Sequence, residues 1–251
     1  MALKKNVTFN GILLYRRNYR ENDMLVKFFT REYGTKMFLI RRGRKPGFKM
    51  SGDILPFTYG QYEGSISDDG LSYIKEPIET HHYLNISNDI ILNAYAMYLM
   101  NLIDAGLSEG EASPRWFNQL FYALKLIDQE IDPAIITNIM EIQLLTLFGV
   151  QPWLKDCVVC HRDDLPLDYS TNYGGLLCEQ HWHLDPLRFN LDQRTVFYFR
   201  QFSVINLKTL NSVNVQRPTK VRLRTLLDSI YSDTVGLHLK SKRFLDEMTQ
   251  I

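Results

Sequence analysis

The sequence predicts an α+β multidomain protein, in which a small N-terminal β-barrel is followed by a helical domain with a small cysteine-rich insertion. Three observations predict this fold. The first 80 residues hold short runs rich in Val, Ile, Phe and Tyr, as β-strands do. From about residue 88, apolar residues recur with the period of a helix. Further along, all three cysteines fall within 22 residues.

Five strands are expected in the first domain, which we place at residues 1–80. Their ranges are 7–15, 24–30, 35–40, 54–63 and 71–76, with turns at 32–34 and 67–70. A sheet this short can remove its exposed edges by closing on itself. A five-stranded Greek-key barrel of the OB type closes it in this way. An SH3-like barrel is the alternative.

The second domain, residues 81–251, is expected to be helical. Its first helix carries apolar residues at spacings of three and four, at Ile90, Ile91, Ala94, Met97, Tyr98 and Leu102. Two more helices begin at Ser113-Pro114 and Asp132-Pro133, where a capping side chain precedes a proline suited to the first turn. Gly149 ends the second of these. Later helices are expected over residues 192–204, 219–231 and 239–248.

The sharpest local pattern is a pair of ligand motifs within residues 157–181. Two residues separate Cys157 from Cys160, and after seventeen more residues Cys178 precedes His181 at the same spacing. Such spacing lets one tight turn aim both side chains at a single ion, and two turns complete a tetrahedral zinc shell. An odd number of clustered cysteines is unlike a disulfide framework. We expect a zinc knuckle with one structural Zn²⁺, with His161 or His183 as alternatives to His181.

The sequence predicts a protein that is not an enzyme. Four protein ligands leave a zinc ion no open position for water or substrate. No convergent nucleophile and base, and no Gly-Lys-Ser/Thr phosphate loop, appear in the sequence. There is also no run of about 18 apolar residues, and no apolar stretch follows the charged N-terminus. We therefore expect no membrane association and a cytoplasmic location.

Charge is distributed unevenly along the chain. The formal net charge is +1, but residues 1–50 contain thirteen Lys or Arg against three acidic residues, which makes this segment +10. Such asymmetry points to a polyanionic partner. Several basic residues lie in the segment 41–49, where glycine and proline prevent regular strand pairing. The residues expected to bind DNA are Arg16, Arg17, Arg20, Lys27, Lys36, Arg41, Arg42, Arg44, Lys45 and Lys49.

A nucleic acid is the expected ligand, bound through its phosphates without sequence preference. Aromatic rings of the barrel could stack on bases, although strand alternation buries about half of them. The available rings are Phe9, Tyr15, Phe28, Phe29, Phe38, Phe57, Tyr59 and Tyr62. A second, weaker basic group at a predicted helix start consists of Arg217, Lys220, Arg222 and Arg224. A solvated helix face is the simpler interpretation of that group.

Several stretches, taken in order, resemble the RecO family. They are Gly11-Ile12-Leu13-Leu14, Tyr19-Arg20-Glu21-Asn22-Asp23, Phe29-Thr30, Gly34, the loop Gly43-Arg44-Lys45, Gly149-Val150-Gln151-Pro152 ahead of Cys157, and Gly174-Gly175-Leu176-Leu177-Cys178. The resemblance spans most of the chain. Many zinc-bearing members of that family have cysteine where this chain has His181.

The resemblance implies an OB barrel followed by a helical domain with a zinc knuckle. It also implies a DNA repair and homologous recombination mediator of the RecF pathway. Such a mediator binds single- and double-stranded DNA, promotes strand annealing and helps to load recombinase with RecR. RecR and the C-terminal tail of single-strand-binding protein are the partners it implies, and association with the nucleoid follows.

A zinc-ribbon transcription regulator is the alternative, in which the knuckle itself contacts DNA. Only the spacing of the zinc ligands supports it. Around the knuckle, Lys155, Arg162 and Arg188 are outnumbered by acidic residues. This local charge opposes docking on DNA.

Overall fold

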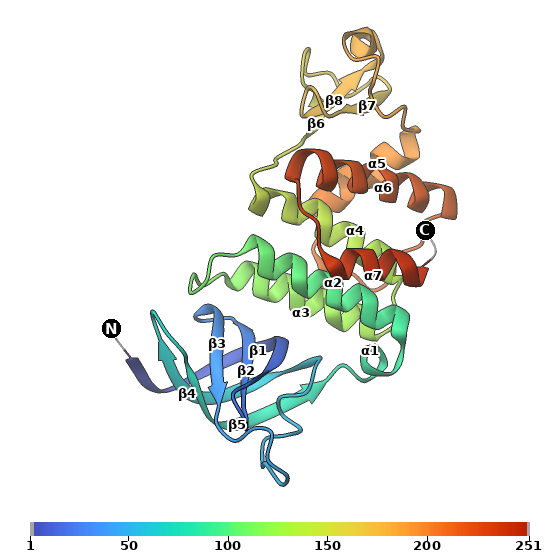
Figure 1. The fold of residues 1–251 in the computed structure, drawn as a ribbon. Helices are drawn as coiled ribbons and strands as arrows, with labels where there is room; N and C mark the ends of the chain where they lie inside the picture. Colours follow the sequence, from blue (N-terminus) through green and yellow to red (C-terminus); the bar gives the residue numbers. More distant parts are fainter. Residues whose placement is uncertain (1–2, 250–251) are drawn as a thin grey trace. The chain divides into compact units, whose positions relative to one another are not determined.

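The structure, a computed structural model, describes residues 3–249 and groups them into two compact units (Figure 1). One unit comprises the residues up to Glu130 together with the segment from Ser241, and the other runs from Ile131 to Lys240. The first unit therefore holds helices as well as the predicted barrel. The domain limits 1–80 and 81–251 stay a prediction.

The first unit contains the five strands that the sequence predicts. They are β1 (Leu3–Tyr19), β2 (Asp23–Thr30), β3 (Gly34–Ile40), β4 (Thr58–Ser67) and β5 (Tyr73–His82). They form one antiparallel sheet in the order β3-β2-β1-β4-β5, with the long β1 at its centre. This five-stranded sheet, followed by helices, fits the predicted OB-type domain.

The two edge strands of the sheet meet and close it. Phe38 of β3 forms a parallel bridge with Ser72, directly before β5. The backbone N–H of Leu39 donates to the Ser72 carbonyl at 2.9 Å, and the Ser72 N–H donates to the Met37 carbonyl at 2.8 Å. Closure satisfies backbone groups that an open edge would expose.

Three strands differ clearly in extent from the prediction: β1, β4 and also β5, which runs over residues 73–82 and not over 71–76. β1 continues to Tyr19 because its last residues pair with the start of β2, with Arg16 opposite Val26 and Tyr19 opposite Asp23. β4 begins at Thr58 and not at residue 54, since residues 41–57 form a succession of turns. The basic segment thus lies in a long irregular connection between β3 and β4, as its glycine and proline content indicates.

Packed aromatic rings fill the barrel. The rings of Phe9 and Phe38 stack with centroids 5.1 Å apart, and Phe28 meets Tyr62 edge to face at 5.0 Å. The Tyr62 hydroxyl donates to the Asp53 carbonyl at 2.8 Å, so burial leaves it satisfied. Burial also raises the pKa of Tyr62 well above its usual value.

Most of the rings considered for base stacking are therefore core residues. Phe9, Phe28, Phe29, Phe38, Phe57 and Tyr62 are buried, Tyr59 is half-buried and Tyr15 is exposed. Phe29 points away from the barrel interior and packs edge to face on Phe117 at 5.5 Å. Among the predicted stacking rings, only Tyr15 lies on the surface.

The helices of the first unit are α1 (Leu84–Asn88), α2 (Ile90–Gly106), α3 (Pro114–Asp128) and α7 (Lys240–Thr249). The first residue of α7, Lys240, is assigned to the second unit. The connection from α2 to α3 lies against β3, where the Gly110 N–H donates to the Thr35 carbonyl at 3.1 Å. Gly34 adopts a φ of 67° directly beside the Glu111 backbone. A side chain at Gly34 would collide with that backbone, so only glycine fits.

The second unit is built on the helices α4 (Pro133–Leu144), α5 (Gln193–Val204) and α6 (Arg217–Ser229). A small sheet of β6 (Trp153–Cys157), β8 (Gly175–Cys178) and β7 (Leu167–Ser170) lies between α4 and α5 in sequence. Glu141 on α4 is fully buried, and Arg224 of α6 donates to both of its carboxylate oxygens at 2.7 and 2.8 Å. Bidentate pairing compensates the buried charge.

The helix starts predicted at Pro114 and Pro133 are confirmed, but not every predicted cap. The carboxylates of Asp132 and Asp192 accept backbone N–H groups at 3.3 and 3.1 Å, as expected for N-caps. Ser113 precedes Pro114 at the start of α3 without a side-chain capping bond. Gly149 has the left-handed φ of 75° that ends the helical segment.

Replacing Arg224 with methionine should destabilise the second unit by about 3 to 5 kcal/mol, because the change leaves Glu141 buried without its partner charge. Urea unfolding followed by circular dichroism measures this loss. Arg217→Met, at an exposed position on the same helix, is the matched control and should change stability by less than about 0.5 kcal/mol. Equal effects of the two substitutions would contradict the expected role of the buried pair.

Candidate metal centre and nucleic-acid interface

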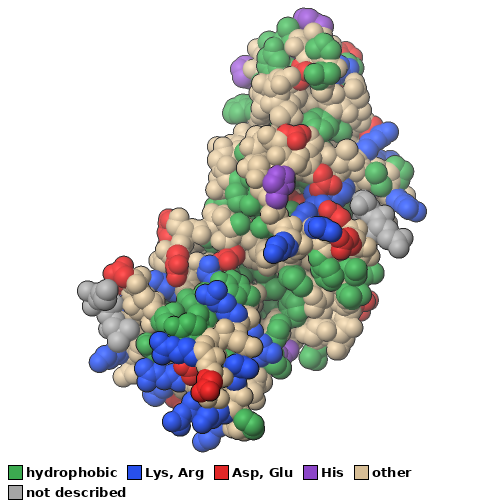
Figure 2. Space-filling view, in the orientation of Figure 1, with side chains coloured by type: hydrophobic (Ala, Val, Ile, Leu, Met, Phe, Trp, Pro, Cys, Tyr) green, Lys and Arg blue, Asp and Glu red, His purple; other side chains and the backbone are tan. Residues whose placement is uncertain are grey.

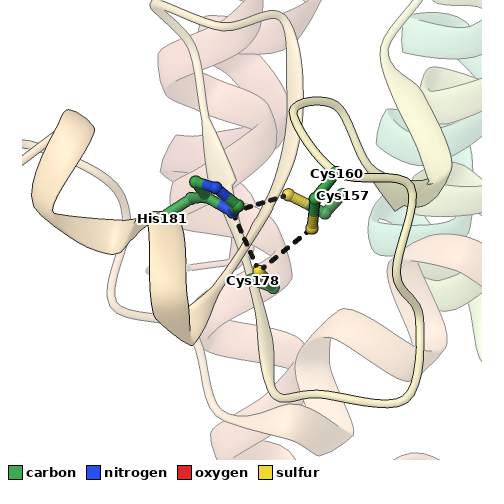
Figure 3. A group of neighbouring side chains, drawn as sticks. All are labelled: Cys157, Cys160, Cys178 and His181. Carbon is green, nitrogen blue, oxygen red and sulfur yellow. Dashed lines mark hydrogen bonds between the residues drawn. The ribbon is translucent and has the colours of Figure 1, made fainter.

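The four predicted metal ligands converge in the second unit (Figure 3). Cys157 ends β6, and the following turn carries Cys160. Cys178 ends β8, and the short helix after it, Glu179–Leu184, carries His181. β6 and β8 run parallel, and the Val158 N–H donates to the Leu176 carbonyl at 2.9 Å. Because parallel strands end at the same side of a sheet, both ligand turns meet there.

The distances between the ligand atoms suit a single tetrahedral ion. The Sγ atoms of Cys160 and Cys178 are 3.7 Å apart, and Nδ1 of His181 lies 3.2 Å from Sγ of Cys178 and 3.6 Å from Sγ of Cys157. All four ligand atoms lie within 4.8 Å of one another. An ion with metal–sulfur bonds of about 2.3 Å separates its sulfur ligands by about 3.8 Å. The Cys3His cluster can therefore hold a metal ion.

The backbone around the cluster favours a thiolate at Cys157. Burial raises the pKa of this thiol, but backbone N–H groups of Cys178, Cys160 and Val159 donate to its sulfur and bring the pKa down to about 6. Burial and the neighbouring thiols raise the pKa of Cys178 to about 11. Because metals bind the thiolate form, one ligand is already suited to a cation near neutral pH.

The alternative histidine ligands have other surroundings. His161 lies 3.1 Å from the Asp156 carboxylate through Nδ1, and its ring meets Trp153 edge to face. His183 is exposed. Of the three histidines, His181 is the one whose ring nitrogen lies among the thiols.

Close packing in the small sheet requires glycine at one position. A Cβ atom on Gly175 would lie 2.7 Å from the Trp153 carbonyl oxygen and 2.6 Å from the Val158 side chain. Gly175 therefore lets β8 approach β6, which brings the two ligand turns together.

Eight of the ten predicted DNA-binding residues have exposed side chains at the barrel. We call them the basic rim: Arg16, Arg17, Arg20, Arg41, Arg42, Arg44, Lys45 and Lys49. Figure 2 shows Lys and Arg side chains gathered over this part of the first unit. Within the part of the chain that the structure describes, none of the eight forms an ion pair.

Hydrogen bonds join the segments that carry the basic rim. The Arg44 N–H donates to the Asn22 carbonyl at 3.0 Å, and its guanidinium donates to the Glu21 carbonyl at 3.0 Å. The Asp23 carboxylate accepts the backbone N–H of Arg42 at 2.8 Å. The β1–β2 turn and the β3–β4 connection therefore lie side by side, although about twenty residues separate them in sequence.

The two other predicted residues do not belong to this exposed surface. Lys36 is buried, and its ammonium donates to the carbonyls of Ser67 and Asp68 at 2.9 and 3.1 Å. Lys27 is half-buried and forms an ion pair with Asp104 of α2 at 2.5 Å. Their role in DNA binding stays a prediction. The sequence does not show which side of each strand the helices and loops cover.

The second basic group is largely neutralised by acidic partners. Lys220 pairs with Asp132, Arg222 with Asp192, and Arg224 with Glu141. Burial raises the pKa of Asp192, but hydrogen bonds from Thr195 and then from Arg222 outweigh it and lower this pKa to about 2. Charge at the start of α6 thus stabilises the second unit internally.

Three tyrosine rings lie under basic side chains, and these cation–π contacts were not predicted from the sequence. Arg20 lies over the Tyr19 ring at 5.1 Å, Arg41 over Tyr73 at 5.6 Å, and Lys4 over Tyr33 at 5.3 Å. The neighbouring positions of Tyr19 and Arg20 could have indicated the first pair. The pair of Arg41 and Tyr73 forms because the barrel closes: Arg41 follows β3 and Tyr73 begins β5, and these two strands meet.

Two family models match the chain. The model described as "Recombination protein O N terminal" matches residues 1–81. The model described as "Recombination protein O C terminal" matches residues 87–243, more than half of the chain. The chain belongs to the RecO family. The first RecO match ends one residue before β5 does, so it corresponds to the five strands.

Curated relatives named DNA repair protein RecO align with this chain over more than nine-tenths of their own length. The DNA repair protein RecO of Levilactobacillus brevis is 54% identical, over 98% of this chain and 95% of the relative. That of Lactiplantibacillus plantarum is 55% identical, over 96% of this chain and 93% of the relative. The DNA repair protein RecO of Latilactobacillus sakei is 52% identical, over 99% of this chain and 91% of the relative. The resemblance to the RecO family is therefore confirmed.

Among residues 3–249, no helix combines the length and the apolar character needed to cross a membrane.

Cys160→Ser should reduce the metal content of the purified chain from about one ion to nearly none, because an alcohol is a poor metal ligand beside thiolates. Metal analysis by mass spectrometry measures this. His161→Ala is the control and should keep the ion, since His161 lies against Asp156. Loss of the ion in His161→Ala with retention in His181→Ala would assign the fourth ligand to His161 instead.

Proposed function

We propose that the chain is a non-enzymatic mediator of DNA repair and homologous recombination, and that its basic rim binds single- and double-stranded DNA. The observation that supports this most is the gathering of eight exposed cationic side chains that form no ion pair among the described residues. Membership of the RecO family adds to it, since the relatives are named DNA repair proteins.

Binding by such a surface depends on phosphates and not on sequence. Each Lys or Arg that neutralises a phosphate releases condensed counterions, which gives an affinity that falls steeply with salt. Hydrogen bonds from Arg16 and Arg44 to backbone carbonyls hold their guanidinium groups in place while their charge stays uncompensated. A fixed array of cations loses less side-chain entropy on binding than a flexible one.

Strand annealing follows from the same interaction. A surface that neutralises phosphates on two strands reduces their mutual repulsion and raises their local concentration. Pairing then needs no covalent step and no nucleotide hydrolysis. The exposed ring of Tyr15, with Lys27 5.9 Å from its centroid, is a surface on which a base of a single strand can stack.

The metal of the knuckle is, in this proposal, one structural Zn²⁺ held by Cys157, Cys160, Cys178 and His181. Three thiolates and an imidazole are ligands that zinc prefers, and four protein ligands complete its shell. The ion stabilises a small sheet that has little core of its own. The basic residues near it are engaged locally, Arg162 with Asp164 and Arg188 with Asp168, so the basic rim is the better DNA surface.

Partner proteins complete the proposed role. The family membership supports RecR as the protein with which the chain loads recombinase in the RecF pathway. It also supports the C-terminal tail of single-strand-binding protein as a second partner. A protein with these partners works in the cytoplasm at nucleoid DNA.

Reversing four charges of the basic rim should weaken DNA binding at low salt by at least about tenfold. With Arg41, Arg42, Arg44 and Lys45 all changed to Glu, the slope of log affinity against log salt should flatten by about 3 to 4 for duplex DNA. Fluorescence anisotropy with labelled single- and double-stranded oligonucleotides, over a range of salt concentrations, measures both quantities.

A control with the same change in net charge uses four exposed residues outside the basic rim: Arg115, Lys125, Lys208 and Arg217, each changed to Glu. This variant should keep most of the salt slope. A rim variant with unchanged slope, or a control that loses as much affinity, would contradict the proposed interface.

A further inference from the structure

A cavity of about 300 Å³ lies within the first unit, between the outer face of the barrel and α3. Side chains in two rows across the strands contribute to it. One row is Asn10, Gln61 and Glu79, and the other contains Tyr59 and His81. Phe117 and Phe121 are contributed by α3. The volume suits one side chain or a similarly small group.

Stacked aromatic rings form much of the cavity wall. Tyr59 stacks on Tyr83 with ring centroids 4.6 Å apart and on His81 at 5.2 Å, and Phe121 meets it edge to face at 5.2 Å. These contacts fix the Tyr59 ring in one orientation. The faces of such rings carry negative partial charge and attract cations.

Among the side chains that line the cavity, the carboxylate of Glu79 carries a negative charge. The Glu79 side chain is 72% exposed, and one of its carboxylate oxygens lies 3.1 Å from Nε2 of His81. Asn10 donates to the Glu32 carboxylate through its backbone and side-chain nitrogens, at 2.9 and 2.8 Å. The Glu32 carboxylate is thus bound to a residue that lines the cavity, although it does not line the cavity itself.

The Tyr59 hydroxyl experiences this negative field. Burial raises its pKa, and the charges of Asp128 and Glu79 raise it further. None of the residues that line the cavity is Lys or Arg. The cavity therefore differs in charge from the basic rim of the same unit.

We propose that this cavity binds the arginine side chain of a partner polypeptide. A guanidinium group is planar and weakly hydrated, so it stacks on aromatic rings while its N–H donors reach carboxylate and amide oxygens. Phe117 and Phe121 supply the aromatic contact, and Glu79 supplies the carboxylate. A phosphate group would be repelled by Glu79. The site is thus a protein-docking point, distinct from the DNA surface.

The test uses the full-length, metal-loaded chain labelled with ¹⁵N. The probe is the capped tripeptide acetyl-Gly-Arg-Gly-amide, and its isosteric neutral counterpart contains citrulline in place of arginine. Titration should shift the backbone amide resonances of Gly11 and Gly60, both of which line the cavity. The arginine peptide should saturate these shifts, and the citrulline peptide should bind at least about threefold more weakly.

Substitutions localise the binding. Glu79→Gln should lower the affinity for the arginine peptide by about two- to fivefold. Glu76→Gln, at an exposed position on the same strand outside the cavity, should leave this affinity unchanged. Neither substitution should alter DNA affinity, which separates this proposal from the function of the basic rim.

Three results would overturn the proposal. The first is equal binding of the arginine and citrulline peptides. The second is an equal loss of affinity in Glu79→Gln and Glu76→Gln. The third is a saturable shift of the same glycine amides by adenosine monophosphate that matches or exceeds that of the arginine peptide, since this would identify an anion site.

Discussion

The barrel depends on the pairing of one long strand. β1 spans 17 residues and pairs with β4 through its first part and with β2 through its second. A one-residue slip in this register would turn the buried side chains of Phe9 and Leu13 to the opposite face. The same register carries Arg16 and Arg17 to the end of the sheet where the β3–β4 connection crosses. One alignment of backbone hydrogen bonds thus sets both the apolar core and the position of the cations.

Charge is organised differently in the two units. In the second unit Lys220, Arg222 and Arg224 each have a carboxylate partner, so these cations contribute to internal stability. In the basic rim, the described contacts of the cations are with carbonyl oxygens and tyrosine rings. Such contacts orient a cation without cancelling its charge. Mutual repulsion within the rim then decreases only when anions from outside approach it.

Sequence reasoning succeeded where chemistry is local. The spacing of Cys157, Cys160, Cys178 and His181 fixes which atoms can reach one ion, and strand and helix types follow from short-range patterns. The contacts of Lys27 and Lys36 could not be predicted, because they come from α2 and from the β4–β5 turn, which are distant in sequence. The cavity beside α3 was not foreseen for the same reason. Its residues come from β1, β4, β5 and α3, and no single segment contains the pattern.

The parallel pairing of β6 with β8 has a consequence for how the chain reaches its native state. Two parallel neighbouring strands need a long connection between them. Here seventeen residues between Cys160 and Cys178 must close into a loop, and the small sheet that they join contains few hydrogen bonds. Loop closure costs conformational entropy before those bonds repay it. A bound ion offsets this cost directly, because it links both ends of the loop. Under the proposed metal binding, persistence of the knuckle would depend on metal supply and thiol reduction, while the barrel, which contains none of the four cluster residues, is held by its own packing.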